Sequence, residues 1–381
     1  MPEHTSARTR SIPARRLLLT VLLGALVVLP SATAGGAPLV PAGAVFVLSN
    51  AVSGNDVIAF ARAADGSLTA AGSFATGGLG TGAITESQGS VVVSPDHRLL
   101  FAVDAGSDQI TSFRIALSGL TRVSTVASGG DFPVSLTYSP PLLYVLNAGA
   151  PEHITGFVVG SGGGLRRLSM SSRLLSGTNV GASQIEFTPD GTKLVVTERN
   201  VQTIDVFTLD PSTGRPTGRV TNPSAGIGPF GFGFTSSGTL IVSEAQSTPT
   251  GGDGAVSSYA VASNGTLSAV TASSTTHQLA TCWIAVTPDD AYAYATNAES
   301  DTVTGYAVDG AGALTPLDSD GITAAAGDHP LDEGIAGGHL YVLQNLAGSI
   351  GIFAIGADGS LTGAGGPTGL PVGSAVGIAA F

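Results

Sequence analysis

The 381-residue chain contains one cysteine, Cys282, and one lysine, Lys193. A single cysteine excludes an internal disulfide, an iron–sulfur cluster and a structural zinc site built on thiolates. Charged residues make up only 11% of the chain, too few for a coiled coil or a helix-rich surface. The formal net charge of -12 repels phosphate backbones, so we expect no nucleic-acid partner.

Long apolar stretches with helical spacing are also missing after residue 34. The chain is rich instead in glycine (54 residues) and proline (21 residues), and 43% of it is hydrophobic. Disordered segments lack the apolar content that folding requires, so this composition predicts a turn-rich globular protein. No segment after residue 34 is long and apolar enough to predict a membrane span.

The N-terminal segment has the pattern of an export signal. Four arginines precede an apolar run from Leu17 to Leu29, and Ala32-Thr33-Ala34 offers the small residues of a signal-peptidase site. The run is shorter than the about 20 residues of a transmembrane helix. We predict a signal peptide over residues 1–34, a linker over 35–43 and one secreted domain over 44–381. The export route, general secretory or twin-arginine, stays open.

An internal repeat of about 45–50 residues predicts the architecture. Each copy reads as an apolar strand, a turn that is most often Ser/Thr-Pro-Asp, a second strand ending in a polar residue, and a third strand with an aromatic. The third-strand aromatic occurs seven times, at Phe60, Phe113, Phe157, Phe207, Tyr259, Tyr306 and Phe353. Seven such repeats are typical of a propeller whose blades are four-stranded sheets.

The two ends of the repeat array complete each other. Residues 45–50 match a second strand that has no first strand before it, whereas residues 376–379 repeat the innermost-strand pattern of residues 333–336. Pairing these segments removes free sheet edges. We therefore predict an all-β fold, a seven-bladed β-propeller of four-stranded blades, closed by pairing the C-terminal strand with the N-terminal blade.

Polar residues recur at one face of this predicted ring. The first and second strands of a blade are antiparallel, so the start of the first and the end of the second lie on the same face. The second strands end in Asn50, Asp104, Asn147, Glu198, Glu244, Asn297 and Gln344–Asn345, and the first strands start at Ser90, Ser135, Gln184, Gly231, Trp283, Asp332 and Ala375. We expect them to surround one mouth of the channel, although Asn and Asp at strand ends often only bond their own backbone.

Some residues of this face can carry chemistry. Five positions carry carboxylates in place of amides: Asp104, Glu198, Glu244, Asp332 and Glu333. If these side chains converge, they would suit a hard cation such as Ca²⁺. No Asp-x-Asp-x-Asp loop accompanies them. Trp283 offers a wall for a ring or sugar, or packs between blades. Cys282 is expected to be a small buried thiol. His329 is either an acid–base group or a loop residue.

The segments Thr281–Asp289 and Tyr292–Asn297, together with recurring Gly-x-Leu-Thr turns, carry a family resemblance. They resemble the seven-bladed lactonase-type propellers, the family that includes bacterial 6-phosphogluconolactonase and fungal carboxymuconate-lactonizing enzyme, and especially its exported actinobacterial branch. The resemblance covers nearly the whole chain after residue 34. It implies a propeller fold and an activity on lactones.

Two motifs that carry the chemistry in that family are altered in this chain. A Pro-Cys-His type segment stands as Pro133-Val134-Ser135, and a Gly-Pro-Arg-His type segment stands as Gly228-Pro229-Phe230-Gly231. The glutamate that follows the second motif survives as Glu244. The resemblance therefore implies the loss of two histidines and an arginine, groups that supply proton transfer and anion binding in lactone chemistry.

Two hypotheses follow, and they leave open whether the chain is an enzyme. The first is an exported lactonase-like hydrolase of a neutral lactone, with Glu244, Glu198 or Asp332 as acid–base groups. The second is a non-catalytic propeller that binds a small polar ligand, a cell-wall glycan or a protein. The candidate ligand-binding residues are Asp104, Asn147, Ser135, Gln184, Trp283, Asn297 and Glu333. We expect a monomer with no resident cofactor.

Overall fold

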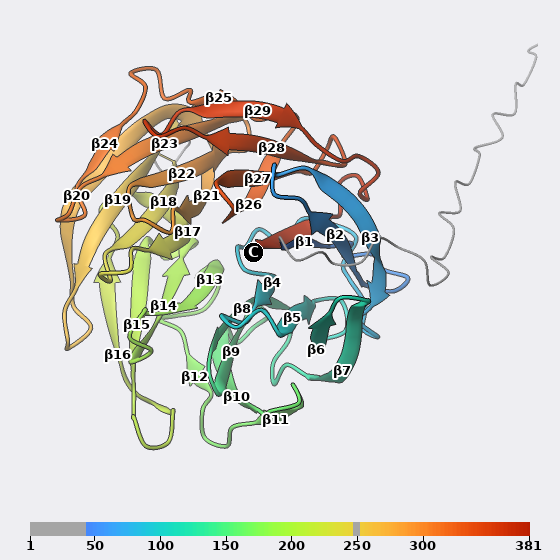
Figure 1. Ribbon diagram of the computed structural model, residues 1–381. Coiled ribbons are helices and arrows are strands. Elements are labelled where there is room, and N and C mark those ends of the chain that lie inside the picture. Colours follow the sequence, from blue (N-terminus) through green and yellow to red (C-terminus); the bar gives the residue numbers. More distant parts are fainter. Residues whose placement is uncertain (1–42, 247–251) are drawn as a thin grey trace, which may run out of the picture.

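Thirty β-strands form seven antiparallel sheets around a central axis in the computed structural model, which describes residues 43–246 and 252–381 (Figure 1). The single helical element in those ranges is the 3-10 turn η1 (Arg199–Val201). The predicted signal peptide and all but the last residue of the predicted linker lie outside the described residues. The chain is a seven-bladed β-propeller, so the fold predicted from the repeat is confirmed.

In each of the first four blades the strands follow one another from the channel outwards. Blade 1 contains β30 (Val376–Ala380), β1 (Ala44–Leu48), β2 (Asp56–Arg62) and β3 (Leu68–Ala75). Blade 2 contains β4 (Val91–Val93), β5 (Leu99–Asp104), β6 (Gln109–Ala116) and β7 (Gly119–Ala127). Blade 3 contains β8 (Pro133–Ser139), β9 (Leu142–Asn147), β10 (His153–Val159) and an outer strand broken into β11 (Leu165–Arg167) and β12 (Arg173–Leu174). Blade 4 contains β13 (Ala182–Phe187), β14 (Lys193–Glu198), β15 (Thr203–Leu209) and β16 (Pro216–Pro223).

The last three blades repeat this order. Blade 5 contains β17 (Ile227–Phe234), β18 (Leu240–Gln246), β19 (Asp253–Val261) and β20 (Leu267–Leu279). Blade 6 contains β21 (Thr281–Val286), β22 (Tyr292–Asn297), β23 (Thr302–Val308) and an outer strand broken into β24 (Leu314–Pro316) and β25 (Ala324–Ala325). Blade 7 contains β26 (Pro330–Ala336), β27 (His339–Gln344), β28 (Ser349–Ile355) and β29 (Leu361–Gly365).

The third-strand aromatics that revealed the repeat are core residues. All seven are buried, with exposed fractions between 0% and 6%. Neighbouring residues of a strand point to opposite faces of a blade, so each blade can pack apolar side chains against both of its neighbours. The repeated aromatic therefore marks one position of a core that runs around the ring.

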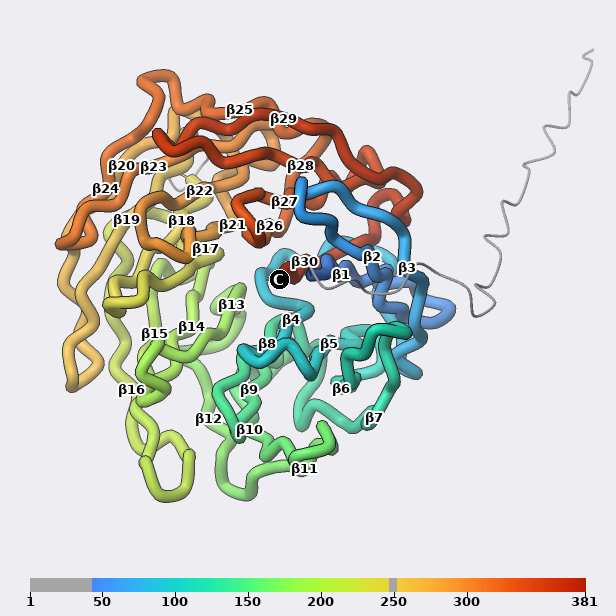
Figure 2. Tube along the Cα trace, in the orientation of Figure 1, coloured from blue at the N-terminus to red at the C-terminus, as the bar shows by residue number. Residues whose placement is uncertain are grey.

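The ring is closed by β1 and β30, which pair antiparallel with Phe46 opposite Ala379 and Val47 opposite Ile378. The backbones of Ala44 and Phe381 exchange two hydrogen bonds of 3.1 and 3.0 Å. Figure 2 shows the C-terminal strand beside β1 at the inner side of blade 1. The closure predicted from the repeat pattern is confirmed.

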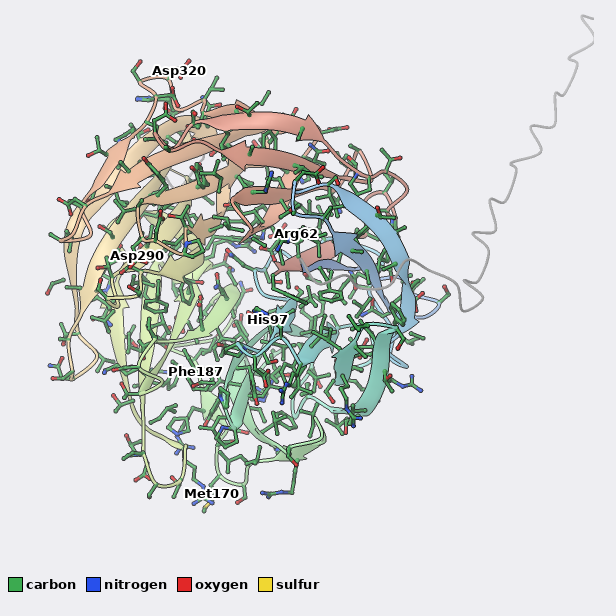
Figure 3. All side chains as sticks on the ribbon, viewed as in Figure 1. Arg62, His97, Met170, Phe187, Asp290 and Asp320 are labelled. Atoms are coloured by element: carbon green, nitrogen blue, oxygen red, sulfur yellow. The ribbon has the colours of Figure 1, made fainter. Side chains whose placement is uncertain are left out.

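The Ser/Thr-Pro-Asp turns join the first and second strands by local hydrogen bonds. The Ser94 hydroxyl donates to Asp96 at 2.6 Å and accepts the N–H of Leu99 at 2.9 Å. Thr188 repeats the first contact with Asp190 at 2.6 Å. His97 follows the first of these turns, and Figure 3 shows it near the centre of the ring. Its imidazole stacks on the Phe381 ring, with 4.4 Å between the two ring centres. These turns form the face opposite the ends of the second strands.

Candidate functional site

A cavity of about 760 Å³ opens on the face where the second strands end. Its polar lining includes Arg199, Glu86, His329 and Glu299, which come from four separate parts of the chain. Phe230 and Trp283, from the inner strands of blades 5 and 6, form an aromatic part of its wall. We call this space the mouth cavity.

Arg199 is the cationic group of the mouth cavity. It follows β14 directly and begins η1, so its side chain projects from the end of blade 4. Its guanidinium forms an ion pair with Glu86 and lies 5.4 Å from the centre of the Phe230 ring. A guanidinium over an aromatic face is stabilised by the ring's electron distribution. The cavity thus holds an arginine between a carboxylate and an aromatic ring.

Trp283 both packs between strands and faces the mouth cavity. It is only 4% exposed, its ring meets Phe230 edge-on at 5.0 Å, and its indole N–H donates to the carbonyl of Ser87 at 3.0 Å. A bulge between Thr281 and Trp283 interrupts the regular pairing of β21. Bulges re-aim side chains at strand ends, and this one belongs to the segment that turns the indole towards the cavity.

His329 stands at the rim of the mouth cavity just before β26. Its backbone is in the left-handed region, with φ at 54°. Its N–H donates to Asp301 at 2.8 Å, and its carbonyl accepts the N–H of Asn345 at 3.1 Å. The backbone on both sides of the imidazole is therefore held by hydrogen bonds, which limits where the ring can go.

Residues 84–90 cross the centre of the ring, and Ile84 and Glu86 among them line the mouth cavity; we call residues 84–90 the crossing segment (Figure 2). The Gln88 side chain exchanges two hydrogen bonds with the backbone of Ile284 in blade 6, at 2.7 and 3.1 Å. The Ser87 hydroxyl donates to Val134 in blade 3, and the Gly89 N–H reaches Asp332 in blade 7 at 3.3 Å. The segment ties distant blades together across the channel.

The crossing segment occupies space beside both altered family motifs. A Cβ placed on Gly231 would lie 2.1 Å from the side-chain oxygen of Gln88 and 2.6 Å from the backbone carbonyl oxygen of Cys282, so nothing larger than glycine fits without moving both. A Cβ on Gly89 would lie 3.1 Å from the Ser135 hydroxyl, which accepts the N–H of Ile185. The two positions at which the resemblance implies lost histidines, Ser135 and Gly231, therefore both lie beside this segment.

The predicted carboxylates at the ends of the second strands do not line the mouth cavity. Asp104, Glu198 and Glu244 are all fully buried. Asp104 accepts the hydroxyl of Thr111 at 2.7 Å, and Glu198 accepts that of Thr203 at 2.8 Å. These bonds join each carboxylate to the third strand of its own blade.

Glu244 follows the same pattern with one difference. Its Oε1 accepts the hydroxyl of Ser257 and the backbone N–H of Gly226, at 2.5 and 2.8 Å, while its buried Oε2 has no hydrogen-bond partner. Burial raises the pKa of this carboxyl above its ordinary value. The geometry places Glu244 as an anchor of the loop before β17, and its catalytic role stays a prediction.

The remaining predicted ligand-binding residues divide into two groups. Asn147 and Asn297 are buried amides bonded to hydroxyls of their own third strands, at 3.4 Å to Thr155 and 2.9 Å to Thr304. Ser135, Gln184, Asp332 and Glu333 lie at the inner strands, and all but Ser135 line a second cavity in the channel. Of all the residues predicted from the ring pattern, only Trp283 lines the mouth cavity.

The carboxylates do not converge on a single point. Among the described residues, no three His, Cys, Asp or Glu side chains form a group that could hold a metal ion. The geometry therefore gives no support to the Ca²⁺ expectation, which stays a prediction. Across the same residues, no helix is long and apolar enough to span a membrane.

Arg199 was missed by the sequence reasoning, although the repeat contains a signal for it. In five other blades the residue after the polar strand end is alanine; these are Ala51, Ala105, Ala148, Ala245 and Ala298. Only blade 4 has arginine at this place. Glu86 and Phe230 carried no such signal, because their positions depend on how the crossing segment and β17 meet.

We expect Cys282 to be unreactive in the folded protein. It is 9% exposed, and burial raises the pKa of its thiol to about 12. At pH 8 only roughly one thiol in ten thousand would be the reactive thiolate. An aromatic disulfide reagent should therefore label Cys282 quickly only after unfolding in guanidinium; rapid labelling of the native protein would contradict this placement.

The seven sheets and the closing strand define the class of the protein as a seven-bladed β-propeller. Residues 40–251 match the family model described as "Lactonase, 7-bladed beta-propeller", and the chain belongs to this family. A comparison with curated proteins finds no match.

Several solved structures share the fold. A candidate 6-phosphogluconolactonase from Bacteroides fragilis superposes with a TM-score of 0.70 at 20% identity, over 90% of this chain and 98% of that one. The periplasmic gluconolactonase PpgL of Pseudomonas aeruginosa gives 0.68 at 19% identity, over 89% and 98%. A candidate 6-phosphogluconolactonase from Bacteroides uniformis gives 0.73 at 17% identity, over 89% and 100%. At these identities the likeness establishes the fold alone.

Proposed function

We propose that the chain is an exported hydrolase that opens a neutral lactone in the mouth cavity. One observation carries the proposal: Arg199, His329 and the aromatic pair Phe230–Trp283 line a single cavity of about 760 Å³. Pockets for small molecules are typically about 300–1,000 Å³ and combine apolar walls with a few polar groups. The cationic and acid–base groups implied to be lost from the family motifs have counterparts in this cavity, at other positions in the chain.

The chemistry assigned to these residues is ordinary ester hydrolysis. The His329 imidazole accepts a proton from water as the water oxygen bonds to the lactone carbonyl carbon. Arg199 stabilises the negative charge that develops on the carbonyl oxygen. The ring C–O bond then breaks, the imidazole returns the proton to the ring oxygen, and the product is a hydroxy acid.

The charges around the mouth cavity favour an uncharged substrate. Arg199 is paired with Glu86, and Glu299 adds a second carboxylate to the lining. A phosphate group would meet this acidic rim with no further lysine or arginine among the described residues that line the cavity. We therefore choose a neutral sugar-type lactone, in keeping with the gluconolactonase among the similar structures.

The test is to incubate the protein with a panel of neutral five- and six-membered lactones. Hydrolysis is measured through the proton that the hydroxy-acid product releases. We expect His329→Gln to lower kcat about 100-fold or more, because a positioned acid–base group contributes about 10²–10⁴. Arg199→Gln should lower kcat by a similar factor. The matched controls Arg98→Gln and His277→Gln lie outside the cavity lining and should retain full activity. No hydrolysis of any lactone above the buffer rate would refute the proposal.

One observation favours a second candidate, binding without turnover. The crossing segment fills the space beside Gly231 and Ser135, where the resembling family carries its histidines. Under this alternative, a sugar or lactone raises the melting temperature without being consumed, and Arg199→Gln removes that shift. Turnover that depends on His329 would exclude it.

Export is part of the same proposal and is tested separately. It rests on the arginines, apolar run and small residues of residues 1–34. The protein secreted by an expressing bacterium should begin after Ala34 when its mass is measured. An intact N-terminus on protein retained in the cytoplasm would contradict this.

A further inference from the structure

A second cavity of about 320 Å³ lies among the inner strands, and Gln88 and Gly89 of the crossing segment line part of it. Three carboxyl groups line it: Glu186 of β13, and Asp332 and Glu333 of β26. Valine, leucine and isoleucine side chains of β4, β8, β13 and β30 form apolar parts of its wall. None of the described residues that line this channel cavity is arginine, lysine or histidine.

Glu333 has no partner in this cavity. It is 4% exposed, and neither of its carboxyl oxygens has a hydrogen-bond partner. The other two carboxyl groups do accept hydrogen bonds. Asp332 accepts hydrogen bonds from the backbone N–H groups of Gly89 and Glu333, and Glu186 accepts one from the side-chain amide of Gln184 at 3.1 Å. Leaving a buried polar group unbonded is costly, so a ligand that satisfies Glu333 would be stabilised in this position.

We propose that the channel cavity binds an organic cation, an alkylammonium or a linear diamine. The lining carries carboxyl groups and no positive side chain, which selects a cation. The three carboxyl groups do not form a group that could hold one metal ion, whereas an ammonium needs only one or two of them. The apolar wall then suits the hydrocarbon part of such a ligand. The inference does not rest on the function proposed for the mouth cavity.

The protonation of the cavity's carboxyl groups should respond to a bound cation. Burial raises the pKa of Asp332 to about 7 and that of Glu186 to about 8. Burial, and then the charge of Asp332, raise the pKa of Glu333 well above its ordinary value. The other titratable side chain that lines the cavity is Tyr138. An ammonium ion favours the ionised carboxylates, so binding should release protons and become tighter between pH 6 and pH 8.

The test is calorimetric titration of the full chain with 1,4-diaminobutane and with n-butylammonium at pH 7.5. We expect saturable binding that weakens about tenfold or more in Glu333→Gln and in Asp332→Asn. Both substitutions keep the size of the side chain, and a melting curve of each variant checks its folding. Asp320→Asn, on an outer loop (Figure 3), is the matched control and should bind like the wild type.

Three results would overturn the proposal. These are no amine binding to the folded wild type, equal binding by Glu333→Gln and the wild type, and saturable binding of Ca²⁺ without binding of either amine. Lactone turnover is measured on the same samples. Its loss or retention leaves the result for the channel cavity unchanged, because His329 and Arg199 line the mouth cavity and do not line the channel cavity.

Discussion

Deleting residues 376–381 should lower the melting temperature of the chain by roughly 10 °C. The deletion removes β30, the inner strand of blade 1, and leaves the edge of β1 unpaired. It also uncovers the pocket that receives Val376 and Ile378, which are 3% and 5% exposed. Burying two such side chains contributes roughly 5 kcal/mol.

The loss extends beyond these two side chains. Phe381 exchanges backbone hydrogen bonds with Ala44, and its carbonyl accepts the Arg62 side chain at 3.0 Å. An unpaired strand edge also invites association with other chains. The truncated protein should therefore melt earlier and aggregate more readily, as measured by circular dichroism and light scattering.

Two controls separate closure from a general effect of shortening. A synthetic peptide of residues 374–381, added in excess, should bind the open edge and restore part of the lost melting temperature. Val372→Ser changes an exposed residue of the loop before β30 and should leave stability unchanged. A truncated chain that melts like the wild type would show that the pairing of β1 with β30 does not hold the ring together.

The second large effect is a fall in stability as the pH rises from 5 to 7.5. The folded state raises the pKa of Asp332 to about 7 and of Glu186 to about 8, mainly by burial. Between its ordinary pKa and these values, each carboxyl holds a proton only in the folded state. The free energy of unfolding therefore decreases by about 1.4 kcal/mol per pH unit for each such group.

The free energy of unfolding changes with these groups between about pH 4 and pH 8. Stability from these groups is fully present below their ordinary pKa values and is lost as the pH rises through the raised ones. Turn aspartates such as Asp96 and Asp190 act in the opposite direction, because their pKa values are lowered, but they do so only in more acidic solution. The melting temperature should thus be several degrees higher at pH 5 than at pH 7.5.

Substitution of the channel carboxyls tests the assignment. Glu333→Gln and Glu186→Gln imitate the protonated side chains, so each should flatten the pH dependence and raise the melting temperature at pH 7.5. Asp320→Asn should keep the slope of the wild type. A wild-type melting temperature that stays constant or rises between pH 5 and pH 7.5 would contradict the raised pKa values of these carboxyl groups.

The candidate site was predictable only in part. The repeat correctly identified which strands end at the same face, and Trp283 lines the mouth cavity as well as packing in its wall. Asp104, Glu198 and Asn297 were also assigned to this face, but hydroxyls of the third strands hold their side chains inside the blades. A pattern of polar strand ends does not show whether a side chain turns inwards or towards a ligand.

The sequence alone predicted the number of blades, their four-strand pattern and the closing strand. They depend on local alternation, turn chemistry and the repeat, and each of these acts over a few neighbouring residues. Folding in three dimensions settled which groups share a cavity. Arg199, Glu86 and His329 come from different blades or loops, and the path of residues 84–90 across the channel depends on bonds to blades far away in sequence. Those contacts arise from packing around a closed ring, and no local pattern encodes them.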